Sequence, residues 1–116
     1  MAELVVYYKP TCTTSRKALK MLDEMKVDYK KVNYYEKPFT KTKLKSLLKK
    51  MNLKAGDILR KRAKEYKELD FRNKKYTQTE IIDFMVKYPD LIERPIAEKG
   101  EKAVLGRPVE KIKEIL

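Results

Sequence analysis

The chain has 116 residues, 40% charged and 42% hydrophobic, which is enough for one soluble globular domain with a modest core. No apolar run approaches the length of a membrane span and no signal-peptide pattern stands at the start, so we expect a cytoplasmic protein without membrane association. One cysteine and no histidine exclude an internal disulfide framework and argue against a metal site.

The net charge is +12, from 29 basic and 17 acidic residues. Such a balance is compatible with nucleic-acid binding. However, 23 of the 29 basic residues are lysines, scattered and often beside Glu or Asp, and lysine- and glutamate-rich surfaces also mark proteins adapted to heat. The aromatic stacking motif of RNA-binding sheets is missing. We therefore favour a solvated basic surface, whose field would attract a small oxyanion, and expect no nucleic-acid partner.

The first third of the chain predicts a strand, a helix and a strand. The apolar run 4–8 is typical of a buried strand. The next segment carries apolar residues at helical spacing. This pattern predicts a helix with one buried stripe, made of Ala18, Leu19, Leu22 and Met25. Residues 27–34 predict a second strand. Cys12 then lies in the strand-to-helix turn, at or just before the helix N-terminus.

The middle of the chain predicts helices. Residues 40–51 carry apolar residues at helical spacing, and Gly56 interrupts the pattern. Residues 57–65 predict a short, basic helix. Thr77 and Glu80 match a capping box that opens a further helix, which Pro89 ends.

The last third predicts two short strands, 93–97 and 102–105, around a turn at Gly100. Residues 106–108 open a final helix, with Pro108 near its first turn and an apolar stripe of Val109, Ile112 and either Leu116 or Ile115. The element order predicts an α/β fold with a mixed four-stranded sheet and flanking helices, the thioredoxin-like arrangement. We expect one domain, 1–116, with a helical insertion at about 39–88.

Cys12 is the principal candidate for chemistry. A lone cysteine is commonly a small buried hydrophobe. At a helix N-terminus, however, free N–H groups and the helix dipole favour the thiolate, which is the reactive form, and the same groups can hold an oxyanion. Ser15 completes a Cys-x-x-Ser pattern and could donate a hydrogen bond to the thiolate. Because the chain has no second cysteine, any redox cycle needs a thiol from another molecule.

The arginines are the second set of candidates, since only six of the basic residues are arginines. A guanidinium group offers bidentate donors that suit tetrahedral oxyanions. Arg94 and Arg107 each precede a proline at an element boundary, and Arg60 stands in the basic segment. Arg62 and Arg72 are interpreted as surface residues. The Arg94–Pro95 bond is a candidate for a cis peptide, with trans as the default.

Four motifs in order carry a family resemblance: Tyr7-x-x-Pro10-x-Cys12-x-Thr14-Ser15-Arg16, Leu59-Arg60, Ile92-x-Arg94-Pro95-Ile96 and Gly106-Arg107-Pro108. Over nearly its whole length the chain resembles the arsenate reductases of the glutaredoxin-dependent type, whose wider family includes the Spx transcriptional regulators. The resemblance implies that Cys12 is the nucleophile. It also implies that Ser15 and Arg16 belong to the oxyanion cradle, and that Arg60, Arg94 and Arg107 bind the oxyanion and stabilise the thiolate.

The implied reaction needs no tightly bound cofactor. Cys12 attacks arsenate or a similar oxyanion, glutathione acts as co-substrate, and glutaredoxin or another thiol reductant completes the cycle. Two features depart from the pattern: Tyr8 stands where these reductases often carry histidine, and the chain stops at Leu116, a length closer to Spx-like members. The alternative is therefore an Spx-like regulator that binds RNA polymerase without reductase activity, although the second cysteine of the Spx switch is missing.

Overall fold

The computed structural model describes residues 3–116. Its contacts divide the chain into two compact units. We call the first the sheet unit; it is formed by the chain up to Lys37 and by Arg94–Leu116. The second, Pro38–Glu93, is the helical unit, and it spans the segment that the sequence predicts as an insertion. The number of domains stays a prediction.

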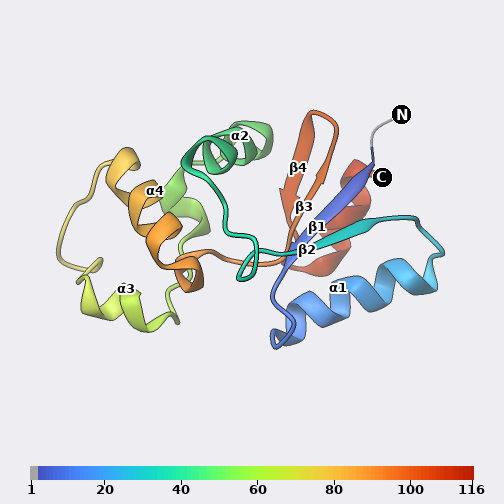
Figure 1. Ribbon diagram of the computed structural model, residues 1–116, viewed down its shortest axis with the longest axis horizontal. Helices are drawn as coiled ribbons and strands as arrows, with labels where there is room; N and C mark the ends of the chain where they lie inside the picture. The colour runs from blue at the N-terminus through green and yellow to red at the C-terminus, as the bar shows by residue number, and fades with distance from the viewer. Residues whose placement is uncertain (1–2) are drawn as a thin grey trace. The chain divides into compact units, whose positions relative to one another are not determined.

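The sheet unit contains β1 (Leu4–Tyr8), α1 (Thr13–Glu24), β2 (Lys30–Asn33), β3 (Ile96–Lys99), β4 (Lys102–Leu105) and the 3-10 helix η3 (Val109–Ile115) (Figure 1). The strand order is β2-β1-β3-β4. β1 is parallel to β2 and antiparallel to β3, and β4 is antiparallel to β3. The predicted mixed four-stranded sheet is confirmed.

The strand directions bring four chain segments to one edge of the sheet. β1 and β2 are parallel, so their carboxyl ends, Tyr8 and Asn33, lie side by side in register. Tyr7 pairs with Ile96 at the start of β3, and Ile96 pairs with Leu105 at the end of β4. The segments that follow β1, β2 and β4 and the segment that precedes β3 therefore meet at this edge, which is where a parallel α/β arrangement places ligands.

One face of the sheet is covered by α1 and η3 through a common hydrophobic core, made of Leu4, Val6, Ala18, Leu22, Ala97, Ile112 and Ile115. Leu22 confirms the predicted stripe, but Met25 is 42% exposed because α1 ends at Glu24 and the chain turns away at Lys26, whose φ is 57°. Of the two alternatives for the last stripe, Ile115 is buried and Leu116 is exposed. The final helix is a 3-10 helix rather than an α-helix.

The helical unit contains α2 (Lys41–Met51), η1 (Ala55–Ile58), α3 (Lys64–Glu68), α4 (Gln78–Lys87) and η2 (Pro89–Leu91). α4 packs against α2, η1 and η2. The Thr77–Glu80 capping box is confirmed, because the Thr77 hydroxyl accepts from the Glu80 amide and the Glu80 carboxylate accepts from the Thr77 amide. Among the helices of residues 3–116, none combines the length and apolar character needed to cross a membrane.

The prediction of a helix over residues 57–65 is wrong. The 3-10 helix η1 ends at Ile58, Leu59 forms an isolated antiparallel bridge with Ile92, and α3 begins only at Lys64. The Arg60 amide donates to the carbonyl of Leu91 at 2.7 Å. The backbone of this segment is thus paired with a distant part of the chain, which prevents a helix from continuing through it.

Candidate active site

Cys12 occupies the N-cap position of α1, with an extended backbone conformation at φ −86° and ψ 123°. Its amide donates to the carbonyl of Lys9 at 3.0 Å, and its carbonyl accepts from the amide of Arg16 at 3.0 Å, as the first hydrogen bond of the helix. Backbone hydrogen bonds therefore fix Cys12 both to the turn after β1 and to the first turn of α1. The thiol is half-buried and lies where the free amides of the first helical turn are concentrated.

Ser15 lies in the first turn of α1 and is completely buried. Its Oγ accepts a hydrogen bond from the amide of Lys9 at 3.3 Å. Because this bond uses an oxygen lone pair, the hydroxyl proton remains available for the Cys12 sulfur. Ser15 thus ties the cysteine turn to the helix and presents a donor to the thiol.

The surroundings of Cys12 favour its ionised form. Burial of the thiol raises its pKa, but the Ser15 amide and hydroxyl, the Arg94 guanidinium and the Thr14 amide act in the opposite direction by hydrogen bonding, and the net effect lowers the pKa of Cys12 to about 7. A large fraction of Cys12 is then thiolate at neutral pH.

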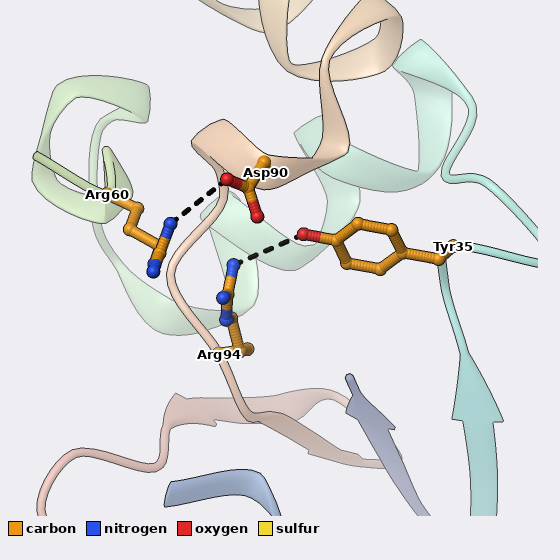
Figure 2. Close-up of polar contacts among 4 residues, drawn as sticks. All are labelled: Tyr35, Arg60, Asp90 and Arg94. Atoms are coloured by element: carbon orange, nitrogen blue, oxygen red, sulfur yellow. Dashed lines mark hydrogen bonds and ion pairs between the residues drawn. The ribbon is translucent and has the colours of Figure 1, made fainter. Parts of the chain in front are cut away.

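Arg94 and Arg107 come from the sheet edge that carries the cysteine turn. Arg94 precedes β3 and is only 4% exposed; besides its interaction with Cys12, its Nη1 donates to the phenol oxygen of Tyr35 at 3.3 Å (Figure 2). Arg107 follows β4, and its Nη1 donates to the carbonyl of Arg94 at 3.0 Å. The structure brings Cys12, Ser15, Arg94 and Arg107 together through this network. Both Arg94–Pro95 and Arg107–Pro108 are cis.

Tyr35 and Lys9 belong to the same network and were missed by the sequence reasoning. Tyr35 follows β2, and the Lys9 ammonium lies 4.6 Å from the centroid of its ring. The predicted strand stopped at Tyr34, which is buried at 1% exposure. The signal that was available is the position of Tyr35 just past the carboxyl end of a parallel strand, one residue beyond a buried tyrosine.

The remaining predicted residues, Arg16 and Arg60, have other surroundings. Arg16 is exposed on α1, one residue after Ser15. Arg60 belongs to the helical unit, where its Nη1 forms an ion pair with Asp90 Oδ2 at 3.1 Å (Figure 2). Both side chains of that pair are partly exposed. Their interaction ties the segment after η1 to η2, which is a structural role for Arg60.

The geometry defines a class of protein: a thioredoxin-like α/β fold with an activated cysteine at the N-terminus of its first helix and guanidinium groups beside it. Within residues 3–116, no group of histidine, cysteine or carboxylate side chains could hold a metal ion. The chemistry of the arrangement is that of a nucleophilic thiolate with anion-binding donors.

Comparison with known proteins identifies the family. The model of the ArsC family matches residues 7–115, and the chain therefore belongs to the ArsC family. The predicted resemblance is confirmed. Together with the relatives, this membership identifies the chain as an ArsC-like thiol oxidoreductase, and its single cysteine fits that class.

Curated relatives and solved structures agree with this assignment. The chain is 35% identical over 116 residues to an arsenate reductase of Escherichia coli strain K12, covering 100% of this chain and 82% of the relative. It is 32% identical over 117 residues to an arsenate reductase of Neisseria meningitidis serogroup B, covering 100% of both. The structure of an arsenate reductase from Vibrio cholerae superposes with a TM-score of 0.92 at 30% identity, covering 99% of this chain and 98% of that one.

Proposed function

We propose that this protein is an arsenate reductase in which Cys12 is the nucleophile and glutathione with glutaredoxin supplies the electrons. The observation that carries the proposal is a single cysteine whose thiolate is stabilised by Ser15, Arg94 and the amides of a helix N-terminus. The relatives named arsenate reductase, similar over the whole length of this chain, support arsenate as the substrate.

In the first step the Cys12 thiolate attacks the arsenic atom of arsenate. A sulfur–arsenic bond forms, an arsenic–oxygen bond breaks, and the protonated oxygen leaves as water. The guanidinium groups of Arg94 and Arg107 neutralise negative charge on the remaining oxygens. The family resemblance on which the proposal builds implies that Arg16 and Arg60 also bind the oxyanion.

The reduction itself requires two further sulfur atoms. The glutathione thiol attacks the arsenic of the adduct and displaces a second oxygen as water. The glutaredoxin thiolate then attacks the glutathione sulfur, so that the bond between the glutathione sulfur and arsenic breaks and its electron pair stays on arsenic, which remains bound to Cys12. Arsenic(V) becomes arsenic(III), and the two external thiols are oxidised to a mixed disulfide. Water releases arsenite from Cys12, which regains its thiol. Because the chain has one cysteine, both external thiols are necessary.

The alternative, an Spx-like regulator that binds RNA polymerase, has less support. Its argument from the short chain is weakened by the Neisseria meningitidis relative, which carries the name arsenate reductase and is matched over its entire length. The second cysteine of the Spx switch is also missing from this chain, which has one cysteine.

The direct test is a coupled assay. Purified protein is incubated with arsenate, glutathione, glutaredoxin, glutathione reductase and NADPH, and NADPH oxidation is followed. We expect turnover that depends on arsenate, on glutathione and on glutaredoxin, and that is abolished in Cys12→Ser, since serine is nearly isosteric but a far weaker nucleophile at neutral pH.

Circular dichroism of Cys12→Ser shows whether the fold is retained. Turnover with thioredoxin in place of the glutathione system would refute the proposed reductant while leaving the reductase. Absence of arsenate-dependent oxidation with either reductant would refute the reductase and favour the regulator.

A further inference from the structure

Tyr35 is fixed at the active site without a part in the chemistry proposed above. Its phenol oxygen lies 3.3 Å from Arg94 Nη1 (Figure 2), and the Lys9 ammonium faces its ring at 4.6 Å from the centroid. Its amide donates to the Asn33 side chain at 3.0 Å, which closes the turn after β2. The backbone, the ring and the hydroxyl of this residue are thus each held by a different group.

The contact with Tyr35 lies at the charged end of the Arg94 side chain. Its guanidinium group stands at the end of a long side chain, and a charge-assisted hydrogen bond to a sulfur anion depends on direction as well as distance. Arg107 holds the main chain of Arg94 through its carbonyl, at 3.0 Å. That contact holds the main chain of Arg94, whereas the phenol oxygen of Tyr35 contacts the far end of its side chain.

We propose that Tyr35 is a positioning residue, whose phenol oxygen anchors the Arg94 guanidinium against the Cys12 sulfur while Lys9 holds the aromatic ring. Lys9 follows β1, Arg94 precedes β3 and Tyr35 follows β2, so the sheet topology itself brings these three residues together. The consequence for catalysis rests on the proposed function, whereas the consequence for the thiol does not.

The test measures Cys12 without any substrate. Because Cys12 is the only cysteine, alkylation by iodoacetamide, followed by mass spectrometry as a function of pH, reports one thiol. Tyr35→Phe keeps the ring and its contact with Lys9 but removes the anchor. We expect the midpoint of its alkylation profile to rise by about half a unit to one unit, because a mobile guanidinium stabilises the thiolate less.

Tyr29→Phe is the matched control. It also removes a tyrosine hydroxyl in the sheet unit, one that donates to Asp23 Oδ1 at 2.8 Å. We expect the Cys12 alkylation profile of this variant to coincide with that of the wild type. Thermal melts of both variants show whether a general loss of packing accompanies any shift.

A double-mutant cycle separates positioning from a direct effect of the phenol. Arg94→Gln alone raises the midpoint, and adding Tyr35→Phe to it changes nothing further if Tyr35 acts through Arg94. An unchanged profile in Tyr35→Phe, or an equal shift in both backgrounds, would overturn the proposal. Since the measurement needs no arsenate or reductant, a protein inactive in the coupled assay can still confirm it, and a negative result here leaves the reductase untouched.

Discussion

At the scale of single residues, the decisive feature is the balance of forces on Cys12. Burial alone disfavours a thiolate, and it is the strongest single influence on this thiol. Several donors of moderate strength act together in the opposite direction, and the net effect is a pKa of about 7. The reactivity of the cysteine is thus a property of the turn, Ser15 and Arg94 together rather than of any one neighbour.

This balance predicts the pH dependence of Cys12 alkylation. The thiolate is the reacting form and its pKa is depressed to about 7, so the rate is at its plateau above that pH and falls as the pH drops through it. At one unit below the midpoint the rate is about tenfold below the plateau. Glutathione, alkylated under the same conditions, provides the reference for an unperturbed thiol, with a midpoint near 8.5 for an ordinary cysteine. A Cys12 midpoint equal to the reference or higher would contradict the stabilised thiolate.

At the scale of elements, the joint between β4 and η3 is packed without spare room. A Cβ placed on Gly106 would meet the Cδ1 atom of Ile112 and the Cγ atom of Pro95, each at 3.1 Å. Ile112 belongs to the core, and Pro95 directly follows Arg94. The Gly106 amide also donates to the carbonyl of Pro95 at 2.8 Å. The close approach of these segments fixes the main chain on which both arginines of the site stand.

We therefore expect Gly106→Ala to destabilise the fold by about 1–3 kcal/mol, the typical cost of overpacking a core. Gly56→Ala is the matched control, since a Cβ there meets no atom within 4 Å. It should leave the free energy of unfolding unchanged or raise it slightly. Denaturant unfolding of the two variants measures the difference. If both alanines behaved alike, the tight joint would not be what makes glycine necessary at position 106.

The elements that could be predicted from the sequence are those that local residues determine. β1, α1 and the capping box at Thr77 depend on periodicity and on neighbours a few positions away, and the structure confirms them. The segment 57–65 was predicted wrongly because Leu59 and Arg60 pair with residues some thirty positions later. Such pairing leaves no trace in local composition.

The same reasoning explains which candidate site residues the sequence indicated. Cys12 and Ser15 were recognisable because the strand-to-helix turn is a local feature. Arg94 and Arg107 stood out because arginine is rare in a chain that prefers lysine. Tyr35 could not be found in this way, because tyrosine is common here, at eight residues, and it is distinguished only by its contact with Arg94 at the sheet edge.

At the scale of the whole molecule, oxyanion binding by the overall positive charge and oxyanion binding by arginine donors of fixed geometry predict different effects of substitution. The net charge of +12 surrounds the protein with a positive field, which attracts any oxyanion regardless of shape. Replacing arginine by lysine leaves that field unchanged and removes only the planar, bidentate donors. Arginine-to-lysine variants therefore distinguish a built oxyanion site from a basic surface.

Arg60 is tested by the same substitution, because the resemblance implies that it binds the oxyanion while the structure shows its ion pair with Asp90. Asp90→Asn removes the partner and keeps the arginine. If Arg60 binds substrate, Arg60→Lys lowers kcat/KM at least tenfold and Asp90→Asn has a smaller effect. Similar losses of thermal stability in both variants, with kcat/KM unchanged, would leave Arg60 with the structural role alone.

The last prediction concerns Arg94 and Arg107, which lie in one network with Cys12. We expect Arg94→Lys and Arg107→Lys each to lower kcat/KM for arsenate, because each loses a charge-assisted hydrogen bond in a partly buried site. Such a loss costs about 1.5–3 kcal/mol, which corresponds to about one to two decades in rate. Arg72→Lys, at an exposed position of the helical unit, should have no effect. Thermal melts exclude unfolding, which matters for Arg107 because its side chain also holds the Arg94 carbonyl. Equal, small effects at positions 72, 94 and 107 would mean that the oxyanion is drawn by the surface field alone, and Arg94 and Arg107 would then lose their assigned role.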